Sequence, residues 1–491
     1  MSSVDAPASN RDEVEAFGYQ QPFQRTIKSF SSFAIGFSFI SITSGIFTTF
    51  AFLLATSGPR GIWMWILASV GQLLVTLVYA QLAGRIPLAG QSYQWASRLS
   101  NPKIGWAFGW LSYAFLAIVV VAVNYGFISQ AFMPLFNIAP SASTTQWLVA
   151  AAGVVEVSVI ILSTKLTSSI NSAAVVTEVV GILGLTIVLL VAAAISGKGS
   201  LHNLTSTGIV NSHSGYFSYN GPFMLALLLG AYTIVGFEAA ANLAEETDEP
   251  RKVVPKAMIR ATWVSGLIGM LFLIALTVAM PNVKTISASA TPVTAIMNAQ
   301  LGSVVERIFL VFAVVSLFAN ALVVMLSGSR MVYAMSRDRR FPGFQLFSRV
   351  NGRTNTPVWA PLLILVGQII IVFTVGGNAQ SLTNLFTAAT ILPALIYLAT
   401  VLLFLAVRRG LHDVPGVFSL GRWQVPVAMS AVVWLLFELT ALLLPSVFWD
   451  AVKVVGLFVV AGIIIFGGFM MFSRRSLEEE PGAEVLETPA A

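Results

Sequence analysis

The chain has 491 residues, of which 56% are hydrophobic and 10% are charged. Soluble globular domains carry about 25% charged residues, so this composition excludes a soluble protein and indicates an integral membrane protein. In a membrane protein the distribution of the net charge of +6 between the loops indicates the orientation, and we expect no nucleic-acid partner. The chain has no cysteine, and its three histidines, His202, His213 and His412, are scattered. We expect neither a metal site nor a cofactor.

Residues 1–28 are predicted to form a polar cytoplasmic tail, because acidic residues such as Asp5 and Asp12 precede any apolar run. About 20 apolar residues span a bilayer as a helix, and the chain divides into twelve such segments. We predict an all-α membrane protein with these spans: 29–56, 62–84, 104–134, 147–164, 173–196, 221–244, 257–281, 300–331, 357–376, 380–407, 424–446 and 451–473.

The distribution of positive charge predicts the orientation. With both termini inside, 22 of the 27 Lys and Arg residues lie on the cytoplasmic side. The five exceptions are Arg60, Lys198, Lys284, Arg307 and Lys453. Because cytoplasmic loops carry the excess of Lys and Arg, this bias favours cytoplasmic termini and an even number of spans, in the plasma (inner) membrane.

Two of the predicted spans contain a break near their middle. The first break is Ile42-Thr43-Ser44-Gly45 in the first span, and the second is Ile234-Val235-Gly236 in the sixth. An unwound turn in a bilayer survives only where it lines a buried cavity, and a matched pair of interrupted helices is typical of a secondary transporter. The alternative is that Gly45 and Gly236 are close-packing glycines of intact helices.

The chemistry of the breaks predicts an amine-bearing ligand, with or without a carboxylate. Spans 1 to 10 carry no Lys or Arg near mid-membrane. A ligand carboxylate would therefore bind backbone amides, those of Ser44, Gly45 and Ile46, at the start of a half-helix. Carbonyls from Tyr232 to Val235 suit an ammonium group. Tyr232 is either an aromatic gate that covers a cation or an ordinary packing tyrosine.

Two carboxylates within the spans are candidates for ion coupling. Placing a charge at mid-bilayer costs roughly 2.5–3.5 kcal/mol, so such a carboxylate is typically paired, hydrated or protonated. Glu238 follows the second break, and Glu178 lies in the fifth span. Each is a candidate proton site, Glu178 alternatively helps to bind a cation, and Glu238 alternatively ties helices together. Glu156 and Glu438 are assigned no role in transport.

Asn124 and Tyr125 in the third span and Asn320 in the eighth lie at depths compatible with the pocket, although buried Asn also bridges helices. The candidate substrate-binding residues are Ile42, Thr43, Ser44, Gly45, Ile46, Asn124, Tyr125, Tyr232, Ile234, Gly236, Phe237 and Asn320.

Four segments then resemble one family. They are Arg85-Ile86-Pro87-Leu88-Ala89-Gly90-Gln91-Ser92-Tyr93; Gly236-Phe237-Glu238; Glu245-Glu246-Thr247 with Pro250-Arg251-Lys252-Val253-Val254-Pro255; and Ser329-Arg330-Met331-Val332-Tyr333 with Arg337-Asp338. Together they resemble motifs of the amino acid-polyamine-organocation (APC) transporters, with Arg339 where that family has a glycine. The first span is most similar to the amino acid/choline (GABA permease-like) branch.

The resemblance implies a LeuT-type fold with two inverted repeats of five spans, residues 29–196 and 221–407. An extracellular loop (197–220), two peripheral spans (408–473) and a cytoplasmic tail (474–491) complete it. Glu178 falls where proton-coupled relatives carry a lysine. Two charged sets on the cytoplasmic side are expected to form an ion-paired gate, with a solvated loop as the alternative: Glu245, Glu246, Arg251 and Lys252, and Arg330, Arg337 and Asp338.

The function implied is import of an amino acid or amine such as GABA, choline or a polyamine, with protons as the coupling ion, by a monomer or homodimer. The alternatives are a sodium-coupled or exchange-type transporter and, more remotely, a transporter-derived sensor. A channel would need a continuous polar pore and an enzyme a catalytic constellation, and the sequence shows neither.

Overall fold

The computed structural model describes residues 12–19, 23–210, 215–352, 354, 356–375, 379–411 and 415–479. The outer parts of both predicted tails lie outside this range. The α-helices in the described part are α1 (Asp12–Glu15), α2 (Ser29–Ile40), α3 (Ile42–Thr56), α4 (Met64–Arg85), α5 (Gln91–Leu99), α6 (Pro102–Phe127), α7 (Met133–Leu135), α8 (Ala142–Leu162), α9 (Thr164–Ser196), α10 (Pro222–Leu225), α11 (Leu227–Thr233), α12 (Ala239–Asn242), α13 (Pro250–Val278), α14 (Val283–Ser287), α15 (Pro292–Arg337), α16 (Phe344–Phe347), α17 (Trp359–Val375), α18 (Ala379–Val407), α19 (Gln424–Leu443) and α20 (Trp449–Phe472).

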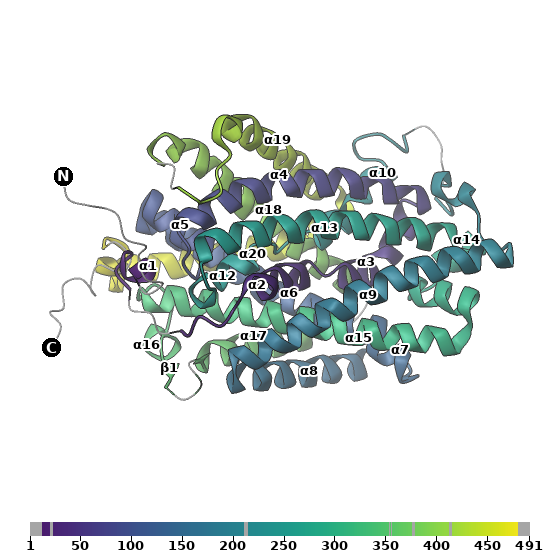
Figure 1. Cartoon of the computed structure of the whole chain (residues 1–491), viewed down its shortest axis with the longest axis horizontal. Helices are drawn as coiled ribbons and strands as arrows, with labels where there is room; N and C mark the ends of the chain where they lie inside the picture. Colours follow the sequence, from purple (N-terminus) through teal and green to yellow (C-terminus); the bar gives the residue numbers. More distant parts are fainter. Residues whose placement is uncertain are drawn as a thin grey trace.

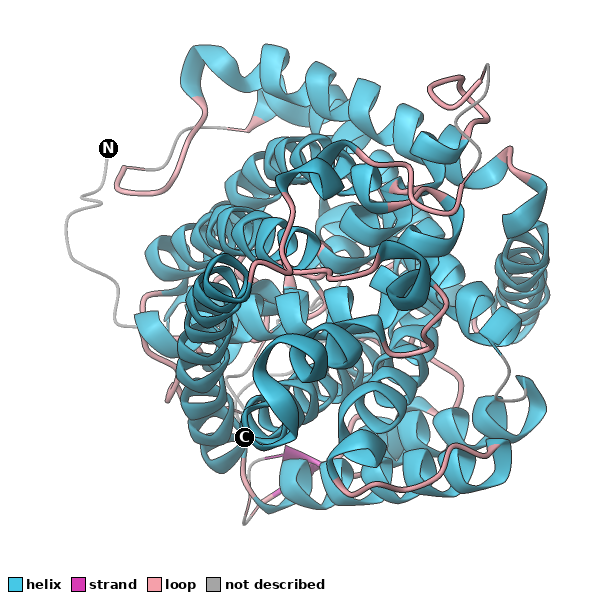
Figure 2. Cartoon of the chain, turned by 90° about the vertical axis from the view of Figure 1, so that its right-hand side faces the viewer, coloured by secondary structure: helices cyan, strands magenta, loops and turns pink. Residues whose placement is uncertain are grey.

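The helices form one elongated bundle whose long members run along a common direction (Figure 1). We call the end that carries α1, α5 and α16 the tail end, and the end that carries α7 and α14 the far end. Figure 2 looks along the bundle and shows helices packed around other helices. A pair of two-residue strands, β1 (Val350–Asn351) and β2 (Thr356–Pro357), forms an antiparallel ladder between α16 and α17. The predicted helical membrane architecture is therefore confirmed.

Ten helical segments in the described part are long and apolar enough to cross a membrane. They coincide with ten of the predicted spans. The sixth and ninth predicted spans correspond to shorter apolar helices, Pro222–Thr233 and Trp359–Thr374. The fifth helix begins earlier than predicted, at Thr164, because Ser163 caps it by accepting a hydrogen bond from the Leu166 amide. α15 is bent at Gly302, where φ is +77°.

The outer helices present apolar faces on the outside of the bundle, as lipid contact requires. α20 is the least covered of the ten, with Ile463 and Ile464 about two-thirds exposed. The first span, Ser29–Thr56, is buried over most of its length, and its two halves pack against α9, α11, α13 and α15. The first interrupted helix therefore lies in the centre of the bundle.

The first break lies at Ser41, one residue before the predicted position. Ser41 has φ 34° and ψ 95°, which separates α2 from α3, and its side chain accepts from the Ser44 amide. Ile42-Thr43-Ser44-Gly45 instead forms the first turn of α3, so the break lies directly before the predicted residues and not within them. The local reason is that a serine hydroxyl can bond the free amides of a new helix, which neither Ile42 nor Gly45 can do.

The second break lies where the sequence predicted it. α11 ends at Thr233, and α12 begins at Ala239. Gly236 between them has φ +85°, a conformation that glycine adopts without steric penalty. The sixth span therefore consists of two short helices joined by five residues that are not helical.

Candidate functional site

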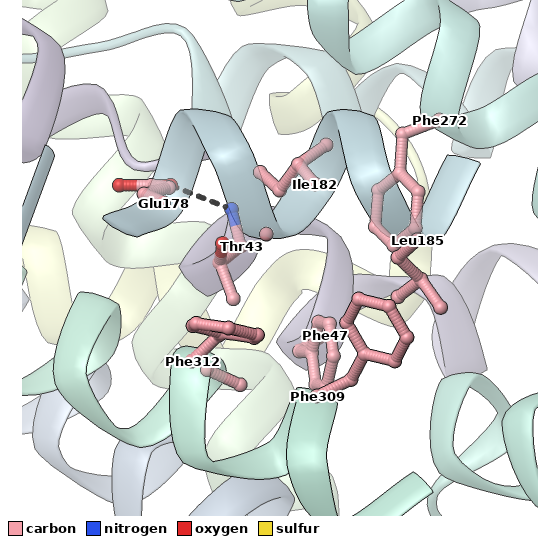
Figure 3. Close-up of a pocket in the computed structure, with 10 residues that line it drawn as sticks. Thr43, Phe47, Glu178, Ile182, Leu185, Phe272, Phe309 and Phe312 are labelled. Atoms are coloured by element: carbon pink, nitrogen blue, oxygen red, sulfur yellow. Dashed lines mark hydrogen bonds between the residues drawn. The ribbon is translucent and has the colours of Figure 1, made fainter. Parts of the chain in front are cut away.

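The amides at the start of α3 already have partners within the protein. The Thr43 amide donates to Glu178 Oε1 at 3.1 Å (Figure 3). The Ser41 hydroxyl donates to the same oxygen, also at 3.1 Å. The Ser44 amide donates to Ser41 Oγ at 3.2 Å, and the Gly45 amide donates to the Ser41 carbonyl at 3.0 Å. The prediction that these amides are open to a ligand is therefore wrong for Ser44 and Gly45 in this conformation. An internal carboxylate occupies part of this helix N-terminus instead.

Glu178 lies on α9 and is only 2% exposed. It forms no ion pair with a described residue, so its partners are the donors of the first break. A small cavity of about 20 Å³ adjoins the carboxyl, and its other lining residues are mainly aromatic and aliphatic, including Phe47, Phe309 and Phe312 (Figure 3). This volume matches about one water molecule. The geometry therefore brings a buried carboxyl, a helix N-terminus and room for a very small ligand together.

Asn320 holds the other side of the same break. Its amide nitrogen donates to the carbonyls of Ser38 at 2.6 Å and Phe39 at 2.8 Å, near the C-terminal end of α2. These carbonyls would otherwise be stranded where α2 stops. The structure places Asn320 at the break, as predicted, but its amide nitrogen binds backbone carbonyls of α2 and does not face a ligand cavity.

The second break is held by a tyrosine that sequence reasoning missed. The Gly236 amide donates to the Tyr397 hydroxyl at 3.0 Å, and the same hydroxyl donates to Glu238 Oε2 at 2.7 Å. Phe237 stacks on the Tyr397 ring at 5.1 Å and meets Tyr79 edge-on at 5.6 Å. Glu238 is thus connected to the backbone of the break through one hydroxyl. Phe237 belongs to the aromatic cluster that positions this hydroxyl.

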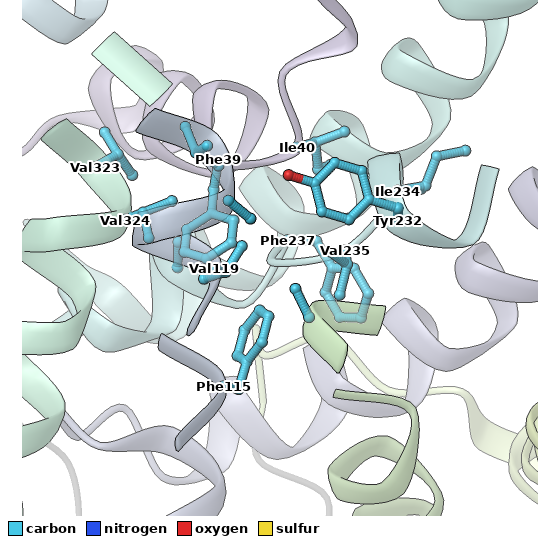
Figure 4. Close-up of a cluster of buried hydrophobic side chains, with 14 of the residues drawn as sticks. Phe39, Ile40, Phe115, Val119, Tyr232, Ile234, Val235, Phe237, Val323 and Val324 are labelled. Carbon is cyan, nitrogen blue, oxygen red and sulfur yellow. The ribbon is translucent and has the colours of Figure 1, made fainter. Parts of the chain in front are cut away.

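Apolar side chains fill the space between the two breaks. Tyr232, Val235 and Phe237 lie on one side, and Phe39 and Phe115 lie on the other (Figure 4). The Phe39 ring approaches Gly236 so closely that a Cβ there would lie 1.8 Å from the ring. Ile234, predicted as a ligand contact, is likewise fully buried in this cluster.

Gly45 makes the matching close contact between the two interrupted helices. A Cβ at Gly45 would lie 2.0 Å from Thr233 Oγ1. Gly45 is therefore a close-packing glycine inside a regular helix, which was the alternative considered from the sequence. Gly236 is not, since it lies in non-helical backbone.

Tyr232 lies close to a cavity that opens toward the far end. This cavity has a volume of about 300 Å³ and is lined by Thr48, Gln130, Leu228 and Phe386, among others. The Tyr232 ring packs on the Phe386 ring with a centroid distance of 5.1 Å. Phe386 therefore separates Tyr232 from the cavity. The hydroxyls of Tyr232 and Ser44 are buried without a hydrogen-bond partner among the described residues.

Asn124 and Tyr125 connect helices away from the breaks, contrary to prediction. The Asn124 amide donates to Glu156 Oε2 on α8 at 3.2 Å, and the Tyr125 hydroxyl donates to the Val372 carbonyl on α17 at 3.3 Å. A buried amide next to a polar group of a neighbouring helix is a common bridge in membrane bundles. The same arrangement accounts for Glu438 on α19, which accepts from the Gln72 amide of α4 at 3.1 Å.

Buried ion pairs close the tail end of the bundle. Arg337 binds Glu245 through two hydrogen bonds of 3.0 Å, and Arg330 binds Glu246 at 2.6 Å. Glu245 also accepts from the Ala89 amide at 3.0 Å. We call these five residues the tail-end lattice. Lys252, which was expected in it, instead pairs with Glu249 on the surface.

The N-terminal segment completes this closure. Tyr19 donates to Asp338 at 2.7 Å, its ring lies 3.7 Å below the Arg337 guanidinium, and Tyr93 donates to the same Asp338 at 2.5 Å. Further along, the amides of Thr26 and Ile27 both donate to the Glu246 carbonyl at 3.0 Å. Burial, and secondarily the Asp338 charge, raises the pKa of Tyr19 above its ordinary value of 10.0. The Tyr19 side chain is therefore held as a neutral, buried group of the tail end.

The sequence profile described as amino acid permease matches residues 27–470. The chain belongs to this permease family. The permease is 25% identical to Amino-acid permease BAT1 of Arabidopsis thaliana over 466 residues, which cover 88% of each chain. It is also 25% identical to Amino-acid permease 2 of Neurospora crassa, over 90% of this chain and 83% of that one. Proteins of this family are transporters rather than enzymes.

The motif segments of the permease meet in space. The loop before α5 contributes Ala89, the segment after α12 contributes Glu245 and Glu246, and the end of α15 contributes Arg330 and Arg337. These segments form ion pairs and hydrogen bonds with one another at the tail end and do not contact the breaks through these bonds. The exception is Gly236-Phe237-Glu238, which forms the second break itself. The residues missed from the sequence, Tyr397 and Tyr19, lie in segments without such a motif.

Proposed function

We propose that this permease is a secondary active transporter that moves an amino acid or a related amine across the membrane by alternating access. The observation that carries the proposal is the pair of interrupted helices in contact at the centre of the bundle. Non-helical backbone at membrane depth is tolerated only where protein or a cavity surrounds it, and transporters place substrate and ion sites at such breaks.

The proposed architecture has twelve spans, with residues 29–196 and 221–407 as inverted repeats of the LeuT type and the last two spans at the periphery. One parallel between the halves supports it. The Thr43 amide of the first break is bound by Glu178, and the Gly236 amide of the second break is bound by Tyr397. Each side chain comes from the helix that would be the fifth of its repeat, α9 and α18 respectively. Equivalent helices thus hold equivalent breaks.

The proposed substrate carries an amine, and amino acids are the first candidates because the relatives named above are amino-acid permeases. The unpartnered hydroxyls of Ser44 and Tyr232 are polar groups that a bound ligand would satisfy. The Tyr232 ring also offers a face to a cationic head. Since the Ser44 and Gly45 amides are bonded internally, a substrate carboxylate would have to displace Ser41 or be absent.

We propose protons as the coupling ion, with Glu178 and Glu238 as the proton-binding groups. Both carboxyls are buried, neither forms an ion pair with a described residue, and each hydrogen-bonds directly or through Tyr397 to a break. A proton gained or lost at either site would change hydrogen bonds of an interrupted helix. Sodium coupling is the alternative at Glu178, where a cation would bind the carboxylate in the small cavity beside it.

In the proposed orientation the tail end is cytoplasmic and the protein lies in the plasma membrane. The conformation described here is then closed to the cytoplasm by the tail-end lattice and the N-terminal segment. The cavity of about 300 Å³ that Phe386 lines is then the path by which a substrate reaches Tyr232 from the extracellular side. Transport requires the lattice to open.

Reconstitution into proteoliposomes tests the proposal. Radiolabelled amino acids, GABA, choline and putrescine are offered with an inward pH gradient and without sodium, and accumulation is compared with that in empty liposomes. Saturable accumulation of one class, abolished by a protonophore, is the expected result. Linear, unsaturable flux would indicate a channel. Binding without any flux would indicate a sensor.

A further inference from the structure

A long apolar groove lies on the outer surface of the bundle between α6, α18 and α20. Its volume is about 590 Å³, and its lining includes Trp106, Trp110, Leu395 and Ile463. Lys103 is its single charged lining residue. None of the residues that form the two breaks lines the groove, and it is not used in the transport mechanism proposed above.

The walls of the groove are fixed by hydrogen bonds that leave its surface apolar. Trp106 Nε1 donates to the Arg340 carbonyl at 3.0 Å, and Trp110 Nε1 donates to the Phe458 carbonyl at 2.8 Å. The two indole rings are parallel, with centroids 5.8 Å apart. The Trp110 ring rests on the α20 backbone, because a Cβ at Gly462 would lie 2.4 Å from it. Both indole N–H groups are satisfied and both side chains are buried, so the two rings form a fixed apolar floor beneath the groove.

Lys103 lies at the tail end of the groove, in the first turn of α6. Its ammonium has no hydrogen-bond or ion-pair partner among the described residues. The groove residues from Lys103 to Leu111 cover about 12 Å of helix, at 1.5 Å per residue. One leaflet of a bilayer contributes about 15 Å of hydrocarbon. The groove therefore matches the depth of one leaflet, with its positive charge at the level of the head groups.

We propose that this groove binds one anionic phospholipid of the leaflet adjoining the tail end. An acyl chain lies along the exposed lining residues Ile104, Val459 and Ile463, over the floor that Trp106 and Trp110 form, and the phosphate group pairs with Lys103. Anionic lipids are attracted to basic groups at this depth, each Lys or Arg contributing about 1 kcal/mol. A second copy of the chain would have to cover Lys103 with an opposite charge.

The bound lipid would support closure of the tail end. Trp106 binds the Arg340 carbonyl, and the Arg340 guanidinium donates to the Ser476 carbonyl at 2.7 Å and to the hydroxyls of Tyr93 and Ser97 at 3.3 Å. Tyr93 in turn binds Asp338. A lipid that holds Trp106 in place therefore stabilises the residues that surround the lattice.

Native mass spectrometry of the full chain, released from detergent with phosphatidylglycerol or phosphatidylcholine, tests the proposal. The wild-type protein should retain one phosphatidylglycerol per chain more tightly than phosphatidylcholine. Lys103→Gln should weaken phosphatidylglycerol binding about fivefold, the equivalent of one head-group contact, and leave phosphatidylcholine unchanged. Ala107→Trp, which fills the groove from an exposed lining position, should weaken binding of both lipids.

Lys453→Gln is the matched control, because Lys453 is an exposed lysine of α20 outside the groove that pairs with Asp450. It should leave the affinity for both lipids unchanged. Equal phosphatidylglycerol affinity in wild type and Lys103→Gln would overturn the proposal, and so would unchanged binding in Ala107→Trp. A wild-type dimer that Ala107→Trp dissociates would assign the groove to a second copy and overturn it as well.

Discussion

Glu178→Gln changes one atom at the first break and tests the coupling proposal. The new side chain keeps a carbonyl oxygen that can accept from the Thr43 amide and the Ser41 hydroxyl, which both lie 3.1 Å from Glu178 Oε1. A hydrogen bond to a charged group contributes about 1.5–3 kcal/mol and one to a neutral group about 1 kcal/mol. The loss is therefore about 0.5–2 kcal/mol for each of the two bonds, or about 1–4 kcal/mol in total if the carboxyl is ionised, against a typical stability of about 5–15 kcal/mol. The variant should fold.

The effect on transport should be much larger than the effect on stability. One pH unit corresponds to about 1.4 kcal/mol, so symport of one proton per substrate supports up to about tenfold accumulation per unit of pH gradient. A glutamine side chain does not take up a proton in the pH range of such an assay. If Glu178 carries the one coupled proton, the accumulation ratio in Glu178→Gln should fall to about one, while exchange of labelled for unlabelled substrate continues; a fall in Glu238→Gln instead would assign the proton to Glu238.

The assay is uptake into proteoliposomes with a pH gradient of one unit and no sodium, followed by counterflow at equal pH. Glu156→Gln is the control, because Glu156 is also a buried carboxyl but hydrogen-bonds Asn124 away from the breaks. It should keep gradient-driven accumulation. Accumulation by Glu178→Gln at the wild-type ratio would refute the assignment, and accumulation that requires sodium and ignores the pH gradient would refute proton coupling altogether.

Three further predictions follow from the other contacts. Gly45→Ala should destabilise the protein and abolish transport, because a Cβ at Gly45 would lie 2.0 Å from the Thr233 side chain. Adding Thr233→Gly in the same chain should restore stability and transport, measured by thermal unfolding and by uptake. No rescue would show that Gly45 contacts ligand instead. Tyr232→Ala should weaken substrate affinity by about 1–2 kcal/mol and Tyr232→Phe only slightly, measured by competition binding, whereas equal losses would implicate the hydroxyl. The folded-state pKa of Tyr19 is raised above 10.0, so its neutral form stabilises the tail end fully below pH 10, and this contribution is lost as the pH rises above 10. In Tyr19→Phe the unfolding midpoint should therefore fall less steeply with pH on the alkaline side than in the wild type. An unchanged pH dependence would contradict the argument.

The sequence predicted the features that depend on composition and local backbone. Hydropathy was enough to position the spans, since each needs about 20 apolar residues wherever its neighbours lie. Gly236 marked the second break because φ +85° is a conformation that few other residues adopt. The first break was misplaced because Ser41, a residue compatible with helix, ends α2 through its contact with Glu178, 137 positions away.

The lining of the site was less predictable, because depth in the membrane does not determine which side of a helix a residue occupies. Asn124 and Asn320 have similar depth and chemistry, yet one binds Glu156 and the other caps α2. Tyr397 could not be distinguished from other tyrosines of the spans, since its role depends on the meeting of α18 with the second break. Such contacts can be identified only once the packing of the helices is known.

The closure of the tail end also constrains how the chain is made. Tyr19 leaves the ribosome among the first residues, but its partner Asp338 follows 319 positions later. Until α15 has been inserted, Tyr19 can contact Gln94 and Arg98 of α5, but neither Asp338 nor Arg337 is available to it. Its docking is therefore completed late in biogenesis, once the end of α15 is in place. A nascent chain stalled before α15 would leave this segment accessible to proteases, whereas the finished protein would bury it.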